Sequence, residues 1–70
     1  MPDDLTLTIT RIYPWEEIVR GELSRSMVAT FYVGNNGAYS ARVPFTDNWH
    51  MELQAAVERE AAKVRQVLHR

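Results

Sequence analysis

Few side chains in this sequence are suited to metal binding, and they are widely spaced. The two histidines, His50 and His69, lie nineteen residues apart on one expected helix, too far to share a ligand. Asp47 and His50 could supply half of a metal site, but no third ligand follows at a suitable spacing. We therefore interpret His50 as a polar residue of a first helical turn, and expect no metal and no cofactor.

Motifs for nucleophilic or phosphate chemistry are also missing from the sequence. The chain has no cysteine, and its three glycines form no phosphate-binding loop. Adjacent Glu16 and Glu17 would not face each other on a helix. Ser24 and Ser26 have no His or Lys at a known motif spacing. We predict that the protein is not an enzyme and has no small-molecule substrate.

The N-terminal third contains one clear strand and one ambiguous segment. The run LTLTIT alternates apolar residues with threonine, the pattern of a half-buried strand, and Ile12 falls out of that phase, which suggests a β-bulge near Arg11. In YPWEEIVRG, Pro14 suits the first position of a helix and Gly21 suits its C-terminal cap. We expect a short helix over residues 14–20, with a strand that ends at a turn around Gly21 as the alternative.

A β-hairpin is expected around VGNNGAY, between SMVATFYV and AYSARVPF. A two-residue turn at Asn36-Gly37 would mix apolar and polar side chains on both faces of the hairpin. A three-residue loop, Asn35-Asn36-Gly37, keeps one face apolar, and a glycine fits the left-handed position of such loops. This loop pairs Val33 with Tyr39, Phe31 with Ala41, Ala29 with Val43, and Met27 with Phe45.

The C-terminal segment from Thr46 is predicted to be one long helix, with Thr46 or Asp47 as its N-cap. Its apolar stripe should lie on the apolar face of the sheet, and its last turns should overhang the strands. The predicted fold is therefore a single α+β domain over residues 1–70. It has a three-stranded, mainly antiparallel sheet with one long C-terminal helix on one face, and the position of the first strand is open. The stripe consists of Trp49, Leu53, Ala56, Val57, Ala61, Val64, Val67 and Leu68.

Two surfaces remain for a partner. On the open face of the sheet, Tyr32 is expected opposite Ser40 and Thr30 opposite Arg42, a mixture that could stack on a base or bind an acidic group. On the outer face of the helix, small residues could let another helix approach closely. The partner-binding candidates are Thr8, Thr30, Tyr32, Arg42, Met51, Ala55 and Ala62.

Composition limits the class of partner. The net charge of −1 gives no general attraction to nucleic acid or anionic membrane, and no apolar run approaches the roughly 20 residues of a membrane span. We expect a cytoplasmic protein, of a size common in phage and mobile-element genomes. The favoured function is a small non-catalytic protein-binding module, an adaptor or inhibitor, acting as a homodimer or with another protein. The alternative is a nucleic-acid-binding regulator that uses the open sheet face and the late-helix cations Arg59, Lys63, Arg65 and Arg70.

Overall fold

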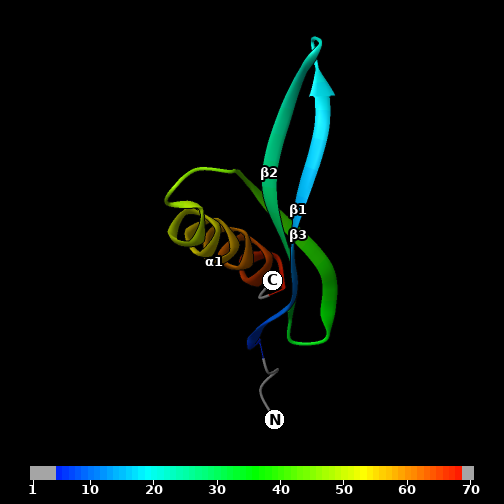
Figure 1. The fold of residues 1–70 in the computed structure, drawn as a ribbon. Helices are drawn as coiled ribbons and strands as arrows, with labels where there is room; N and C mark the ends of the chain where they lie inside the picture. The colour runs from blue at the N-terminus through cyan, green and yellow to red at the C-terminus, as the bar shows by residue number, and fades with distance from the viewer. Residues whose placement is uncertain (1–4, 69–70) are drawn as a thin grey trace.

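The computed structural model describes residues 5–68, which form three strands and one helix. Their bounds are β1 Leu7–Val19, β2 Glu22–Val33, β3 Asn36–Pro44 and α1 Trp49–Leu68. The sheet is antiparallel with the order β1-β2-β3, and α1 lies on one of its faces (Figure 1). This confirms the predicted α+β fold and places the first strand beside β2.

The prediction of a short helix over residues 14–20 is wrong, and the alternative of a strand is correct. Strand β1 continues to Val19, and a two-residue turn at Arg20-Gly21 leads directly into β2. Both turn residues have positive φ, 54° and 81°, as a type I′ hairpin turn requires. Gly21 therefore serves a hairpin and not a helix cap. Pro14 is tolerated because β1 is an edge strand, where one N–H has no ladder partner.

The expected β-bulge near Arg11 is confirmed. The register of β1 against β2 shifts between Ile9 and Arg11, so that Thr10 is the extra residue. The Thr10 hydroxyl donates a hydrogen bond to the carbonyl oxygen of Thr30 at 3.2 Å. Because the bulge adds one residue, Ile12 returns to the face that Ile9 occupies.

The second hairpin has the predicted faces but a different register. Its turn is Gly34-Asn35, with positive φ only at Gly34, as in a type II′ turn, so the three-residue loop Asn35-Asn36-Gly37 is wrong. A bulge at residues 37–38, opposite Tyr32, restores the phase, so each apolar residue stays on its expected side. The observed pairs are Phe31 with Tyr39, Ala29 with Ala41, and Met27 with Val43.

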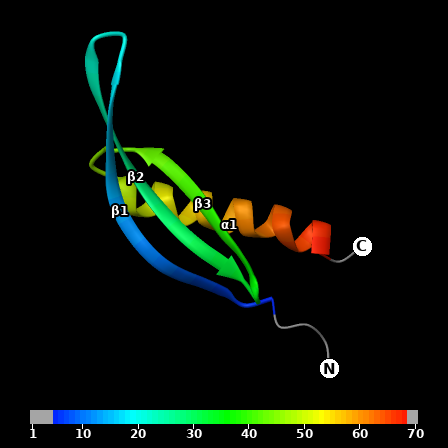
Figure 2. The same ribbon diagram turned by 90° about the vertical axis from the view of Figure 1, so that its right-hand side faces the viewer.

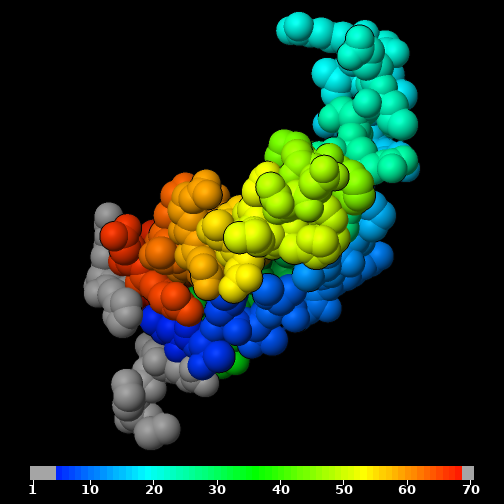
Figure 3. Space-filling model, turned by 60° about the vertical axis from the view of Figure 1, so that its left-hand side comes forward, coloured from blue at the N-terminus to red at the C-terminus, as the bar shows by residue number. Residues whose placement is uncertain are grey.

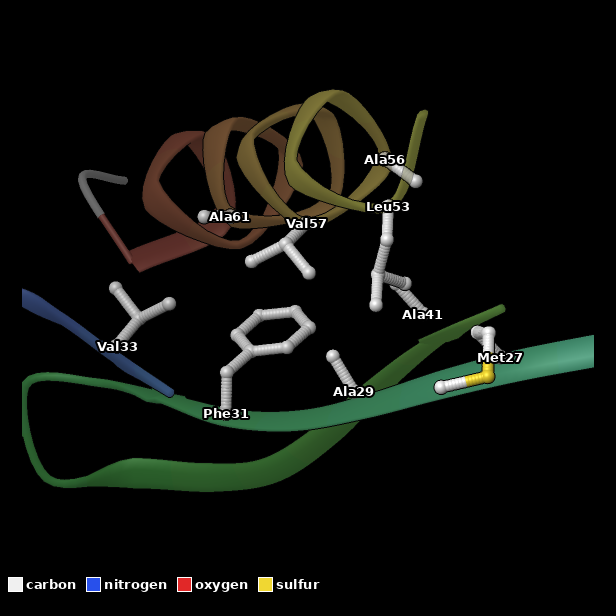
Figure 4. Packing of buried hydrophobic residues seen from close by; sticks show 9 residues of the cluster. All are labelled: Met27, Ala29, Phe31, Val33, Ala41, Leu53, Ala56, Val57 and Ala61. Carbon is white, nitrogen blue, oxygen red and sulfur yellow. The ribbon is translucent and has the colours of Figure 1, made fainter. Parts of the chain in front are cut away.

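The core lies between α1 and the apolar face of β2 and β3 (Figure 4). Phe31 and Val33 are fully buried and lie beneath Val57 and Ala61 of the helix. Two expected members are not buried: Phe45 follows the end of β3, and Val67 lies on the solvent side of the last turn. The buried cluster consists of Met27, Ala29, Phe31, Val33, Ala41, Leu53, Ala56, Val57 and Ala61.

Helix α1 begins later than expected, so neither Thr46 nor Asp47 is its N-cap. The first helical hydrogen bond runs from the Glu52 N–H to the Asn48 carbonyl, which places Asn48 in the cap position. Thr46 stabilises this end in another way. Its hydroxyl accepts from the Asn48 N–H at 3.3 Å and donates to the Glu52 carboxylate at 3.0 Å.

The β1-β2 hairpin projects far beyond the two layers, and the last turns of α1 also extend past the strands (Figure 2). We call residues 15–25 the arm. Every arm residue is exposed except Ser24, which is half-buried. The last turns of α1, which were predicted to overhang the strands, still contact the rest of the fold, since Val64 and Leu68 pack on the core and Arg65 donates to the Leu5 carbonyl. The arm gives the molecule its elongated shape, 51 × 21 × 18 Å.

Candidate protein-binding surface

The helix covers only part of the sheet. Helix α1 packs on β2 and β3, and β1 at the far edge has no comparable contact with it. As a result, the helix-side residues Ile9 and Ile12 of β1 remain 44% and 50% exposed. Burying the exposed half of such a side chain contributes about 1 kcal/mol, so this strip favours a covering partner.

A groove of about 300 Å³ runs between β1 and the N-terminal half of α1. In Figure 3 these two elements, blue and yellow, lie side by side, with the arm projecting beyond them. The groove is mainly apolar, and its polar groups belong to three helix side chains that are exposed to solvent. Its lining residues are Leu7, Ile9, Ile12, Ala29, Trp49, His50, Leu53, Gln54, Val57 and Glu58.

The arm presents further apolar side chains on the same side of the sheet. Ile18 and Leu23 are cross-strand partners near its tip, and they are 69% and 61% exposed. Closer to the core, Glu16 pairs with Arg25, with 2.8 Å between the carboxylate and the guanidinium. The helix side of the arm therefore carries an ion pair followed by an apolar tip.

The candidates on the open face lie together, although their neighbours differ from expectation. Across β2-β3, Tyr32 lies opposite the bulge at residues 37–38 and not Ser40, and Thr30 lies opposite Ser40 and not Arg42. Both differences follow from the two-residue change in the β2-β3 register, while on the other side of β2 Tyr32 pairs with Thr8. Thr30 is also half-buried and engaged with Thr10, with 3.0 Å between the two hydroxyl oxygens.

Arg42 lies opposite Val28 and lines a shallow hollow on the open face. The arm side of this hollow is aromatic, because Tyr13 and Trp15 of β1 reach it. The Arg11 guanidinium lies 4.7 Å from the centre of the Tyr13 ring, within the range of a cation–π contact. The hollow therefore combines aromatic rings and cations, and its lining residues are Tyr13, Trp15, Val28, Ser40 and Arg42.

The remaining candidates, Met51, Ala55 and Ala62, are all exposed on the outer face of α1. They lie on the opposite side of the molecule from Thr8 and Arg42, since α1 separates them from the sheet. The seven candidates therefore belong to two surfaces that one partner domain cannot cover together.

The late-helix cations do not extend the open face either, because α1 lies on the other side of the sheet. Lys63 lies 3.6 Å from the Glu60 carboxylate, and Arg65 hydrogen-bonds the Leu5 carbonyl. Arg59 is exposed on the helix, and Arg70 lies outside the described residues. The structure thus separates Arg59, Lys63 and Arg65 from Arg42.

Within residues 5–68, no three His, Asp or Glu side chains come close enough together to hold a metal ion. His50 stacks on Trp49 with 3.8 Å between ring centres, and His69 lies outside the described residues. Over the same residues, no helix has the length and apolarity needed to cross a bilayer.

Sequence reasoning missed the groove and the arm. The arm follows from the segment that was expected to be a helix, since a helix at residues 14–20 would have ended β1 before the arm, whereas the groove follows from where α1 lies on the sheet. The available signal was the strand-like alternation of Tyr13, Trp15 and Glu17 against Ile12, Pro14 and Ile18. The exposure of Ile9 and Ile12 had no such signal, because it depends on where α1 lies.

No family model, no curated protein and no solved structure matches this chain. The case for function therefore rests on these surfaces alone.

Proposed function

We propose that this chain is a small non-catalytic protein-binding module, an adaptor or inhibitor, and that its main binding surface is the groove between β1 and α1. The observation that carries this proposal is the incomplete cover of the sheet. Helix α1 leaves Ile9 and Ile12 half exposed beside Trp49, in a continuous apolar groove. Apolar surface of this kind, with polar groups at its rim, is typical of protein interfaces.

A comparison of three variants tests which surface binds. The immobilised protein is used to capture partners from extracts of cells that encode it, and the same assay is run with Ile12→Asp, Arg42→Ala and Met51→Asp. These substitutions alter the groove, the open face and the outer helix face respectively, all at exposed positions. We expect Ile12→Asp to abolish capture, because a carboxylate would be buried without a partner.

Circular dichroism must show that each variant is folded. Capture that survives Ile12→Asp and is lost in Met51→Asp would contradict the assignment to the groove. No capture by the wild type, together with a monomeric state in solution, would remove the basis for protein binding.

The alternative is a nucleic-acid-binding regulator, and the hollow on the open face favours it. Tyr13 and Trp15 offer rings for base stacking, and Arg11 and Arg42 offer cations for phosphate. Fluorescence anisotropy with single-stranded DNA and RNA oligonucleotides tests this role. Binding that weakens with added salt and is lost in Trp15→Ala and Arg42→Ala would support it. Absence of binding at low salt would exclude it.

A further inference from the structure

We propose that the groove between β1 and α1 receives the arm tip of a second copy of this chain, and that two copies exchange arms in a two-fold dimer. This inference rests on the proposed function and identifies the protein that binds the groove as a second copy of the chain. In a two-fold dimer both copies contribute the same surface to the interface, so that surface must carry both of the parts that fit each other. The groove and the arm tip are such parts, because the groove lies between β1 and α1, and strand alternation puts Ile18 and Leu23 of the tip on the same side of the sheet as Ile12.

The first argument is the chemical match between tip and groove. Ile18 and Leu23 form an exposed apolar pair at the tip, with no other element of the described chain covering them. The groove offers Ile9, Ile12 and Trp49 as an apolar counterpart. An extended arm cannot fold back onto its own groove, because both belong to the same continuous strand β1. Burial of the tip therefore requires another molecule.

The second argument is charge. Arg20 lies in the turn at the arm tip, and Glu58 lines the groove. Both are exposed, and within residues 5–68 neither has an ion-pair partner. A salt bridge between Arg20 of one copy and Glu58 of the other gives both charges a partner.

The structure disfavours the other simple dimer, in which two β1 edges pair through their backbones. Val19 and Glu22 flank the two-residue turn and form a hydrogen-bonded pair. Counting back from Val19, every second residue of β1 therefore hydrogen-bonds to β2 through its backbone, and the residues between them direct their backbone N–H and C=O groups to the free edge. Pro14 is one of the outward residues, and it has no N–H to donate. Side chains, and not the strand edge, are thus the available contacts.

Sedimentation equilibrium of the wild type and two variants tests the proposal. Ile18→Asp alters the tip and Ile12→Asp alters the groove. Each should weaken dimerisation about a hundredfold or more, because each change occurs twice in a two-fold dimer. Mixed together, the two variants should associate more tightly than either variant alone, since one of the two contacts joins the intact tip of the Ile12→Asp chain to the intact groove of the Ile18→Asp chain, and only the other contact carries both substitutions. Met51→Asp, a matched change at an equally exposed site, should leave the dimer unaffected.

Each other outcome overturns arm exchange. A dimer that survives Ile12→Asp but not Ile18→Asp would mean contact between tips alone, and a mixture that associates no more tightly than either variant alone would exclude the reciprocal contact. Loss of the dimer in Met51→Asp would point to the outer helix face. A wild type that stays monomeric at millimolar concentration would also refute the dimer. Protein binding through the groove would still stand in that case if Ile12→Asp abolished capture of another protein.

Discussion

Strand β2 runs through two regions of the molecule that differ in what covers them. From Met27 to Val33 its helix-side residues are buried beneath α1, whereas Leu23 and Arg25 in the arm face solvent. Both regions form regular antiparallel pairs with β1. Strand formation therefore follows from local alternation and a suitable turn, while stability follows from the second layer. The core keeps the fold together, and the arm leaves apolar surface for a partner.

The largest expected difference between the two regions is the effect of removing an apolar side chain. Phe31→Ala should lower the free energy of unfolding by about 3–5 kcal/mol, because Phe31 is fully buried. That is most of the stability of a domain of this size. Leu23→Ala, on the same strand and face, should cost less than about 0.5 kcal/mol. Urea denaturation followed by circular dichroism measures the free energy of unfolding of both variants, at a dilution where the chain is monomeric. Equal losses in the two variants would contradict the distinction between the core and the arm.

Glycine substitutions compare the two regions at their turns. A Cβ atom at Gly37 would lie 2.7 Å from Cδ2 of Tyr32 and 3.1 Å from the carbonyl oxygen of Phe31. Gly37→Ala should therefore destabilise the protein by about 2 kcal/mol through overpacking. At the arm tip, Gly21→Ala meets no atom within 4 Å and should cost about 1 kcal/mol, from its positive φ alone. When Tyr32 is also replaced by alanine, urea denaturation should show a smaller cost for Gly37→Ala and the same cost for Gly21→Ala. An unchanged cost for Gly37→Ala would refute the steric explanation.

Arg20→Asn should sharpen the comparison because stability and association respond in opposite directions. Asparagine followed by glycine is the preferred pair for a type I′ turn, so the monomer should gain about 0.5–1 kcal/mol. Loss of the charge opposite Glu58 should at the same time weaken the proposed dimer. Amide hydrogen exchange of the arm and sedimentation equilibrium measure the two effects, with Glu22→Gln as the control. A variant that stabilises the arm and also tightens the dimer would argue against a role for the Arg20 charge.

The smallest expected effect is that of the ion pair between Glu16 and Arg25. Their side chains are 47% and 50% exposed, so the pair should contribute less than about 0.5 kcal/mol. A double-mutant cycle with Glu16→Gln and Arg25→Gln measures the coupling, which should vanish near 1 M salt, where the Debye length falls to about 3 Å. A coupling above 1 kcal/mol that persists in salt would show that the arm is more rigid than its exposure indicates.

Much of the fold could be predicted from local patterns. The alternation in SMVATFYV placed Met27, Ala29, Phe31 and Val33 on one face, and the structure confirms it. The long helix and most of its buried stripe were predicted in the same way, as was the bulge near Arg11. The register of the second hairpin was not, because a turn at Gly34-Asn35 with a bulge beyond it preserves the same faces as a longer loop.

The candidate site was the least predictable feature. The open-face residues Thr8, Thr30, Tyr32 and Arg42 do share one surface, since that depends only on strand periodicity. The groove depends on which strands α1 covers, and no local pattern encodes the position of a helix across a sheet.

The sequence alone therefore determined the strands of the hairpin, the extent of the helix to within a turn, and the side of each apolar residue. Those features depend on contacts between residues that are near in the chain. Our interpretation of the sequence left helix and strand open at residues 14–20, where the structure has a strand, and only the tertiary structure left Ile9, Ile12 and Ile18 uncovered. The physical reason is that burial is set by packing between distant segments, and one helix is too narrow to cover a sheet with a protruding arm.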